Sequence, residues 1–277
     1  MSKLTDKIMK PLWMEYPEYE RYSLGWRMGA GEDYAGSFWG WFEALPESDK
    51  KEYMELFPEP ITWKGFWDDK DDNTQFYIKN DFVTFFWNNE RKAKYSVQKI
   101  INSKSKFVMF WGHTPAASGN IGNNVFSQWW KQNFLEETVN YNCMEQYMMS
   151  KKALLFDDKE VNDMIMNESN PKRIKALGRN VRNFDEALWD ELKYTIVLNG
   201  NWRKFSQNKD LRDYLISTKD KILVEASPYD NIWGIGMSAQ DEHADRANKW
   251  KGTNLLGFAL TEVRDELRRV WKNENLF

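Results

Sequence analysis

Strand-like segments are few and short in this sequence, whereas most of the other apolar residues recur at the spacing of a helix. Bulky apolar runs of strand length occur at Phe82 to Trp87, Phe107 to Trp111 and Ile222 to Glu225. So few strand residues can form only a small sheet, and the core must come mainly from helices. The sequence therefore predicts an α+β fold that is predominantly helical with a small sheet.

Helical periodicity is strongest in the second half of the chain. The clearest predicted helix is the last one, which Asn254 is placed to cap and whose buried stripe runs from Leu256 to Val270. The other helices predicted in this half cover Cys143 to Phe156, Lys159 to Asn167, Pro171 to Val181, Asp185 to Asn199 and Leu211 to Ser217.

The first part of the chain, to about residue 70, is loop-rich and aromatic. Because glycines punctuate it up to Gly40, we expect no long regular element before that residue. A short helix is predicted from Ser48 to Phe57, where prolines end it. Further on, Arg91 to Ile101 is weakly helical, and Gly112 to Asn124 has the composition of a loop.

Aromatic side chains are unusually abundant, with 15 Trp, 17 Phe and 12 Tyr. Such side chains bury large areas and also form stacking walls for flat ligands. We expect some of the tryptophans to line a cleft, although an aromatic-rich core is the simpler explanation for any single one.

The formal net charge is -3 and the pI about 5.7. Tight, non-specific binding to nucleic acid needs a dense basic face, so this balance argues against it but leaves room for a local phosphate pocket.

Because Cys143 is the only cysteine, no intrachain disulfide is possible, which suits a reducing compartment. Met1 to Trp13 has no apolar core of a secretory signal, and no apolar run reaches membrane-spanning length. We expect a cytoplasmic protein without a membrane partner.

Only two histidines, His113 and His243, are present. A zinc site built from histidines or thiolates is therefore excluded. No group of carboxylates has a recognisable metal-ligand spacing, so we expect neither a metal nor a cofactor. Catalysis would then rest on carboxylates and lysines.

The first candidate site lies on the helix predicted from Cys143. Glu145 and Lys152 are seven residues apart, which places them on one stripe about 10 Å apart along the axis. Burying an acid and an amine on an apolar face costs folding free energy unless another group pairs with them. The alternative is a lysine that snorkels to solvent beside a surface glutamate, and the residues alone favour it.

The second candidate is Leu177-Gly178-Arg179, followed by Trp189 and Lys193. An arginine beside a glycine near a helix end suits a phosphate. The alternative, which the residues alone favour, is a helix C-cap with a solvated arginine.

Two further groups follow along the chain. The segment from Lys204 to Asn208 could bind a polar ligand, although such clusters are common on surfaces. Later, a predicted strand ends in Glu225, and the loop after it presents Asp230 and Trp233 three residues apart. Glycines such as Gly234 allow the backbone close approach there, and loops held by a rigid scaffold often carry function.

Taken in order and spacing over residues 107–277, these groups resemble the NADAR family, which includes YbiA-like proteins and is proposed for NAD and ADP-ribose metabolism. Each piece is weak alone, and together they are specific. The resemblance is carried by Phe110-Trp111, Ser127, Glu145-x-Tyr147, Lys152-Ala153, Leu177-Gly178-Arg179, Trp189, Lys204-Phe205-x-Gln207-Asn208, Leu215 with Thr218, Glu225, Asp230-x-x-Trp233-Gly234-x-Gly236, Gly252-x-Asn254-x-Leu256-Gly257 and Arg264.

The resemblance implies a YbiA-like catalytic domain in residues 106–277 and an N-terminal aromatic-rich extension, residues 1–105, packed on it. The extension has no counterpart in the small bacterial members, and the loop from Gly112 to Asn124 is longer than they need. We expect the extension to be a structural cap. The alternative is a wall of the cleft or a contact for a larger substrate.

The resemblance also implies an N-glycosidase. One branch of the family removes ADP-ribose from guanine bases, and another cleaves phosphorylated ribosylamino intermediates of riboflavin synthesis. We expect the first for this chain, because a long aromatic extension suggests a bulky substrate, ADP-ribosyl-guanine in a nucleotide or nucleic acid. The second, with a phosphoribosyl metabolite as substrate, is the alternative. A non-catalytic module that binds ADP-ribose or NAD is a third possibility, and a structural or partner-binding protein is the last.

The family chemistry suggests roles for individual residues. Lys152 is the expected nucleophile, through a Schiff base with the opened sugar, because burial lowers the pKa of a lysine. Glu145 and Asp230 are expected to serve as acid, base and stabiliser of positive charge on the sugar. Substrate would be bound by Trp233 and Trp189 at the base, by Arg179 at a phosphate, and by Trp111, Ser127, Tyr147, Lys204, Gln207, Asn208, Gly234 and Asn254.

Overall fold

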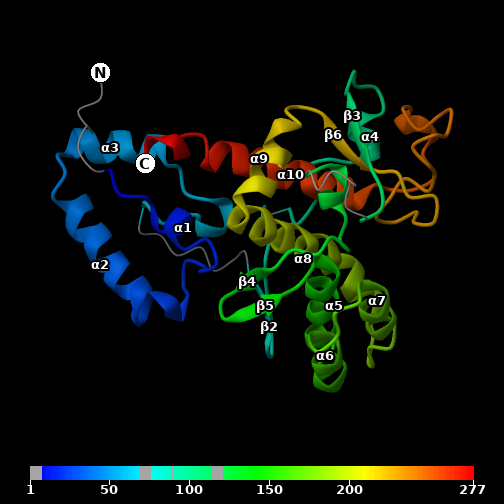
Figure 1. Ribbon diagram of the computed structural model, residues 1–277, viewed down its shortest axis with the longest axis horizontal. Helices are drawn as coiled ribbons and strands as arrows, with labels where there is room; N and C mark the ends of the chain where they lie inside the picture. The colour runs from blue at the N-terminus through cyan, green and yellow to red at the C-terminus, as the bar shows by residue number, and fades with distance from the viewer. Residues whose placement is uncertain (1–7, 69–75, 89, 114–120) are drawn as a thin grey trace.

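The computed structural model describes residues 8–68, 76–88, 90–113 and 121–277 (Figure 1). Residues 1–7, at the start of the N-terminus without a secretory signal pattern, and residues 114–120, most of the predicted loop, lie outside the described residues. The helices are α1 (Leu12–Glu15), α2 (Ala30–Glu43), α3 (Glu47–Leu56), α4 (Val97–Ile100), α5 (Met144–Leu155), α6 (Lys159–Met166), α7 (Pro171–Arg179), α8 (Glu186–Gln207), α9 (Lys209–Ser217) and α10 (Leu255–Val270). The strands are β1 (Phe76–Lys79), β2 (Phe82–Phe85), β3 (Phe107–Phe110), β4 (Phe134–Glu136), β5 (Val139–Tyr141) and β6 (Ile222–Glu225).

The α+β, mainly helical architecture is confirmed, but the strands of the described residues form three two-stranded sheets rather than one. The antiparallel pairs β1–β2 and β4–β5 are local hairpins. The pair β3–β6 is parallel and joins segments more than a hundred residues apart, with Phe107 opposite Ile222 and Phe110 opposite Glu225. This pairing brings the end of β3 beside Glu225, where the candidate loop begins.

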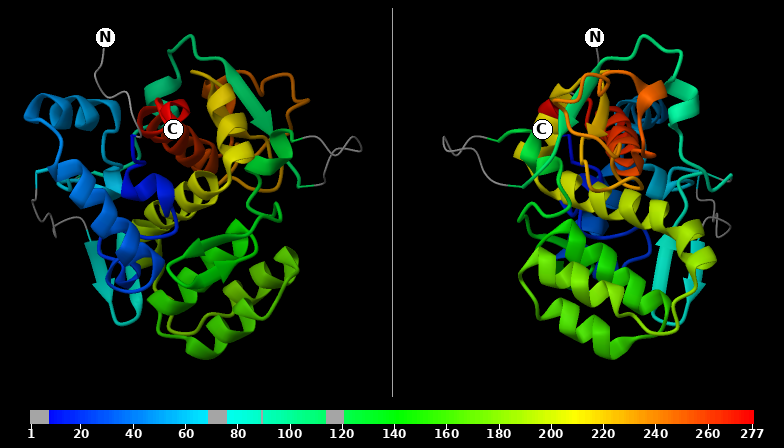
Figure 2. Two further views of the ribbon diagram at one scale, coloured as in Figure 1. Left: turned by 60° about the vertical axis from the view of Figure 1, so that its left-hand side comes forward. Right: turned by 90° about the vertical axis from the view of Figure 1, so that its right-hand side faces the viewer.

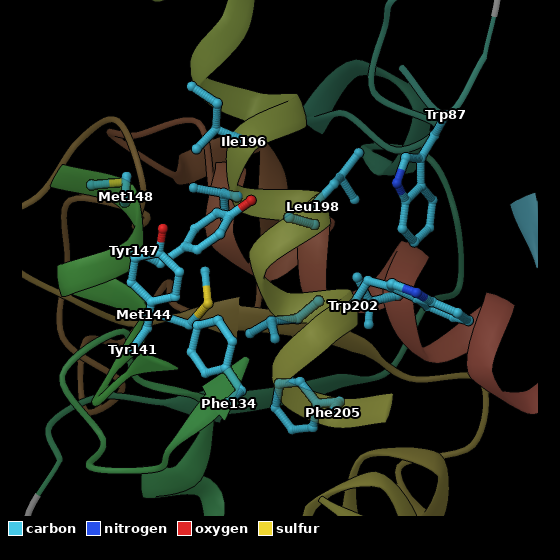
Figure 3. Close-up of a cluster of buried hydrophobic side chains, with 14 of the residues drawn as sticks. Trp87, Phe134, Tyr141, Met144, Tyr147, Met148, Ile196, Leu198, Trp202 and Phe205 are labelled. Atoms are coloured by element: carbon cyan, nitrogen blue, oxygen red, sulfur yellow. The ribbon is translucent and has the colours of Figure 1, made fainter. Parts of the chain in front are cut away.

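The central helix α8 is longer than predicted, because it continues through Asn199 to Gln207. Asn199 and Gly200 resemble the end of a helix in sequence, but both are buried here. A Cβ at Gly200 would lie 2.5 Å from Met144 and 2.6 Å from the Tyr147 ring, so glycine lets α5 approach α8. Figure 3 shows the core that results, built from side chains of α5, α8 and the β4–β5 hairpin.

Helix α2 contradicts the expectation that no long element precedes Gly40, because it extends across three glycines. Tertiary packing outweighs their low helix propensity. The side chains of Phe38 and Phe42, on one face of this helix, are buried in the core. A Cβ at Gly31 would lie 2.2 Å from the Gly25 carbonyl oxygen, so the close backbone contact there requires glycine.

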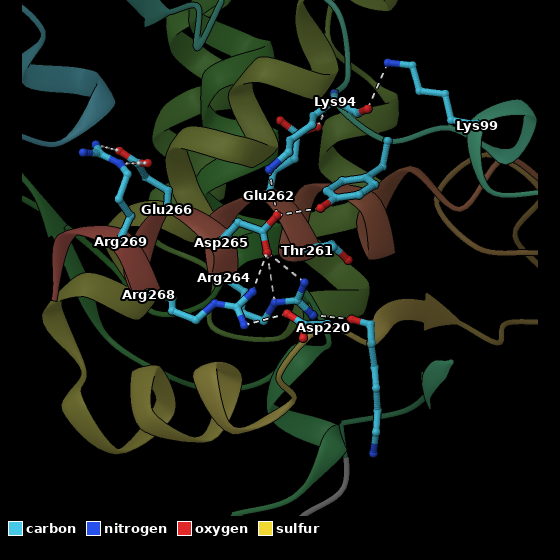
Figure 4. A network of polar contacts seen from close by, with 12 residues as sticks. Lys94, Lys99, Asp220, Thr261, Glu262, Arg264, Asp265, Glu266, Arg268 and Arg269 are labelled. Carbon is cyan, nitrogen blue, oxygen red and sulfur yellow. Dashed lines mark hydrogen bonds and ion pairs between the residues drawn. The ribbon is translucent and has the colours of Figure 1, made fainter. Parts of the chain in front are cut away.

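The predicted helix over Arg91 to Ile101 shortens to the four residues of α4. The residues before it are held instead by α10 (Figure 4). The Lys94 amide donates to Glu262 at 2.6 Å, and its ammonium pairs with Asp265 at 2.8 Å. The Tyr95 hydroxyl donates to the same Asp265 carboxylate at 2.6 Å. Backbone groups committed to a neighbouring helix are not available for a longer helix of their own.

The other predicted elements are confirmed to within a few residues, with α3 beginning at Glu47 and β2 ending at Phe85. Strands β1, β4 and β5 and the single turn α1 were not predicted; none exceeds four residues.

The N-terminal segment, drawn in blue, packs beside the C-terminal part of the molecule (Figures 1 and 2). Its contacts are specific: the Ile61 amide donates to Glu266 at 2.7 Å, Arg269 donates to the Glu59 carbonyl at 2.7 Å, and Arg203 pairs with Glu20 at 2.5 Å. The division of the chain at residue 105 stays a prediction. None of the helices in the described ranges has the length and apolar character that crossing a membrane requires.

Candidate active site

Three carboxylates from different elements approach one another at one end of the β3–β6 pair. Glu145 lies in the first turn of α5, Glu225 is the last residue of β6, and Asp230 lies in the loop that follows. The pKa of Glu145 is raised to about 7, mainly by burial and in smaller part by the nearby Asp230, against a lowering by Lys175, by a hydrogen bond from Trp129 and by Arg179. Burial, Asp230 and Glu145 together raise the pKa of Glu225 to about 8, against a lowering by Lys175.

Glu145 is buried and Glu225 half-buried, and each has one buried carboxylate oxygen without a partner in the part of the chain that the structure describes. Trp129 donates its indole N–H to Oε2 of Glu145 at 3.1 Å, but Oε1 of Glu145 and Oε2 of Glu225 are buried without a hydrogen-bond partner among the described residues. The side-chain oxygen and nitrogen of Gln128 are likewise buried without a hydrogen-bond partner among the described residues. Buried polar atoms are rarely left unpaired, so these atoms point to a proton or a ligand. With pKa values near neutrality, the two carboxyls can hold and release a proton at physiological pH.

The loop after β6 is shaped to hold Asp230 beside Glu225. One oxygen of Asp230 accepts the amides of Ile232 at 2.9 Å and Trp233 at 2.8 Å, closing a tight turn. A Cβ at Gly234 would lie 2.8 Å from the Glu225 carbonyl oxygen, so only glycine fits there without a shift. Gly234 therefore acts through its backbone, by letting the loop fold back onto the strand.

Lys152 lies two turns along α5 from Glu145. Its ammonium donates to the Gly178 carbonyl at 2.9 Å and lies 4.1 Å from the Phe184 ring centroid and 5.6 Å from that of Trp189. Desolvation by these neighbours lowers the pKa of Lys152. This residue is therefore half-buried and partnered, rather than snorkelling freely to solvent.

Helix α7 runs along the face of α5 that carries both residues. The positive charge of its Lys175 lowers the pKa of Glu145, and its Gly178 carbonyl accepts a hydrogen bond from Lys152. A Cβ at Gly178 would lie 2.0 Å from the Met149 sulfur, so the glycine permits this close packing. Arg179, the last residue of α7, is exposed and placed to meet a ligand from solvent.

Four of the expected binding residues are occupied by structural contacts. The Lys204 ammonium is fully buried and donates to the Val125 carbonyl at 2.6 Å, and burial lowers its pKa to about 7. Gln207 bonds both backbone groups of Leu135, and Asn208 donates to the carbonyls of Asn133 and Lys204. Asn254, expected as a helix cap, makes no side-chain capping bond; it accepts from the Glu225 amide and donates to the Leu223 carbonyl. These four side chains hold the backbone of neighbouring segments in place. Their contact with substrate stays a prediction.

The remaining expected residues divide between the core and the rim. Tyr147 points into the core (Figure 3). Its hydroxyl donates to Glu136 at 3.2 Å. Ser127 accepts the Trp129 amide at 3.2 Å and so helps to place that indole. Trp189 and Trp233 are half-buried, and Trp111 is exposed at the end of β3.

Two residues of the site had no role assigned from sequence. Glu225 could have been predicted as a site residue, because a carboxylate at the end of an apolar strand is a sequence pattern that indicates a functional position. Trp129 offered no signal, because only folding places its indole N–H against Glu145. Among the described residues, no group of three or more histidine, cysteine, aspartate or glutamate side chains is arranged to hold a metal ion.

Comparisons with known proteins give one family match and several similar proteins. The model of the NADAR domain matches residues 109–268. N-glycosidase R617 of Acanthamoeba polyphaga mimivirus is 48% identical over 166 residues, which are 58% of this chain and 96% of that protein. N-glycosidase Npun_R5314 of Nostoc punctiforme is 33% identical over 127 residues, which are 46% of this chain and 74% of that protein. The solved structure of the Escherichia coli protein YbiA is 23% identical, with a TM-score of 0.47, and the match covers 65% of this chain and 94% of that one.

The family model matches more than half of the chain, and the viral relative is matched over nearly its whole length. The chain therefore belongs to the NADAR family and is an N-glycosyl hydrolase.

Proposed function

We propose that this enzyme removes ADP-ribose from ADP-ribosylated guanine in nucleic acid by hydrolysing the ribosyl N-glycosidic bond. The observation that carries the proposal is the pair of buried carboxyls, Glu145 and Glu225, each with an unpartnered oxygen and a pKa raised to about 7 and about 8. Such a pair can supply an acid and an anion together at neutral pH.

The surroundings of the two carboxyls suggest which one stabilises the positive charge and which one donates the proton. Glu145 has an indole donor and two nearby cations, so it ionises first and would stabilise positive charge that builds on the anomeric carbon. Glu225 keeps its proton longer and would give it to the departing exocyclic nitrogen of the base. Water then adds a hydroxyl group to the anomeric carbon, and its second proton restores the acid.

Lys152 offers a covalent variant of the same reaction. Its lowered pKa increases the fraction of free amine. The amine would attack the anomeric carbon of the opened sugar as the bond to the base breaks, forming a Schiff base that water hydrolyses to the free sugar and the amine. Borohydride trapping of an adduct on Lys152 would support this variant, whereas near-normal turnover by Lys152→Ala would exclude it.

Phosphate groups of the substrate would meet the cations of α7. Lys175 and Arg179 lie within electrostatic reach of Glu145, and Arg179 is exposed at the helix end. Arginine suits phosphate because its guanidinium donates two parallel hydrogen bonds.

The test is to incubate the purified chain with an oligonucleotide carrying ADP-ribosylated guanine and, in parallel, with the ribosylamino intermediate of riboflavin synthesis. We expect mass spectrometry to detect released ADP-ribose and restored guanine. Cleavage of the small metabolite alone would contradict the proposal.

The second candidate is hydrolysis of that phosphorylated ribosylamino metabolite, because the same carboxyls could serve both substrates. A relative from maize, the riboflavin biosynthesis protein PYRR, gives it modest support: it is 28% identical over 131 residues, which are 45% of this chain but only 19% of that protein.

A further inference from the structure

Two exposed aromatic rings stand next to the candidate site. Trp111, directly after β3, is 56% exposed, and Tyr229, in the loop after β6, is 88% exposed. Their ring centroids are 6.2 Å apart, with the planes tilted by 50°. Rings this exposed add little to the stability of the core, yet they lie in contact with each other on one edge of the β3–β6 pair.

These rings are connected to the buried acids by the backbone. Tyr229 immediately precedes Asp230, and Trp111 immediately follows Phe110, which is the strand partner of Glu225. These chain connections place the pair beside the carboxylate site rather than on an unrelated surface.

A second aromatic contact leads inward from the pair. His113, two residues after Trp111, lies with its ring centroid 5.3 Å from that of Trp129 and its plane tilted by 60°, and the indole N–H of Trp129 donates to Glu145. We call Trp111, Tyr229, His113 and Trp129 the aromatic rim. It leads from exposed rings at one end to the buried Glu145 at the other, so a long ligand with its reacting ribose at Glu145 would place its far end on Trp111 and Tyr229.

We propose that Trp111 and Tyr229 form a subsite for the adenine ring of the ADP-ribosyl group. This inference rests on the proposed function, because ADP-ribose carries a second flat ring beyond the reacting ribose, whereas a phosphoribosyl metabolite does not. Aromatic side chains with exposed faces stack readily on nucleobases, which all present a π-face. The subsite would thus distinguish ADP-ribosyl substrates from phosphoribosyl ones.

The test measures binding of free ADP-ribose and of ribose 5-phosphate to the full chain by isothermal titration calorimetry. Tyr229→Ala is expected to weaken ADP-ribose binding about tenfold, in line with the loss of one stacking partner, and to leave ribose 5-phosphate unchanged. Tyr229→Phe should retain binding, because the ring and not the hydroxyl is used. Tyr22→Ala, at an exposed tyrosine of the N-terminal segment, is the matched control and should have no effect.

Specific results would overturn the subsite. Unchanged ADP-ribose affinity in the Trp111→Ala, Tyr229→Ala double variant would do so, as would equal weakening for both ligands or no binding of ADP-ribose by the wild type. Cleavage assays separate this outcome from failure of the proposed function. If the wild type cleaves ADP-ribosylated guanine but the double variant has an unchanged KM, the subsite is wrong and the function stands. If the wild type binds ADP-ribose through Tyr229 without cleaving, the subsite stands and the function is wrong.

Discussion

At the scale of single residues, the electrostatics of Glu145 and Glu225 follow from competition between burial and local partners. Both are removed from solvent, which favours the neutral carboxylic acid. Glu145 is nearer to donors and cations, and Glu225 has fewer of them. Because the pKa of Glu145 is raised to about 7 and that of Glu225 to about 8, Glu145 is expected to lose its proton first.

This difference predicts a bell-shaped dependence of kcat on pH. Activity should rise as Glu145 ionises through about pH 7 and fall as Glu225 loses its proton through about pH 8. Glu225→Gln should lower kcat by about a hundredfold or more and remove the alkaline limb, because the amide cannot give up a proton.

The pH profile of Asp81→Asn, a change on the exposed β1–β2 turn, should match that of the wild type. An alkaline limb that persists in Glu225→Gln would assign the acid to another residue.

At the scale of elements, glycines set the distances between the helices that carry the site. Gly200 lets α8 approach the back of α5, and Gly178 lets α7 approach its front. Helix α5 is thus held closely on two sides, which restricts the position of Glu145 and Lys152. Glycine costs roughly 1 kcal/mol of helix propensity relative to alanine, so its presence inside α7 and α8 reflects packing.

Gly200→Ala is therefore expected to destabilise the fold by about 1–3 kcal/mol, because its Cβ would lie within 2.7 Å of Met144 and Tyr147. It should also lower kcat, since displacing α5 displaces Glu145. Urea denaturation and steady-state kinetics measure the two effects.

Gly36→Ala in α2 is the matched control. A Cβ there meets nothing within 4 Å, so alanine should stabilise the protein by about 0.5–1 kcal/mol through helix propensity alone. If both changes behaved alike, steric contact would not be the reason for Gly200.

At the scale of the whole molecule, a partly buried ionic network joins the N-terminal segment to the rest of the fold. Arg203 of α8 pairs with Glu20 at 2.5 Å and with Glu136 at 3.1 Å. Glu136 also pairs with Lys151 and accepts the hydroxyl of Tyr147, both on α5. The segment thus reaches the back of the helix that carries the candidate catalytic residues.

Arg203→Met is expected to cost about 3–5 kcal/mol of folding free energy, because it removes the cation that Glu20 and Glu136 share and leaves Lys151, the other partner of Glu136, to face both carboxylates. Arg268→Met should cost no more than about 1 kcal/mol, since its partner Asp220 is exposed and its other partner, Asp265, keeps its ion pairs with Lys94 and Arg264. Thermal denaturation of the two variants measures this difference. Equal losses would mean that the Arg203 network contributes no more than a surface ion pair.

The sequence by itself determined the elements whose physics is local. Helices α5, α6, α7, α9 and α10 were predictable because apolar periodicity acts within one or two turns, and α6 and α7 also have side-chain caps in Asp158 and Asn170. Family membership and the candidates Glu145, Lys152 and Asp230 were equally readable, because ordered motifs survive in the linear sequence.

Only the tertiary structure decided what depends on partners distant in sequence. Helix α2 forms across glycines because Phe38 and Phe42 are buried, and α8 continues past Asn199 because Gly200 fits against α5. Trp129 meets Glu145, and β6 brings Glu225 beside them, only after segments far apart have packed. The raised pKa values arise from the same packing, because desolvation is a property of the folded interior and not of the chain.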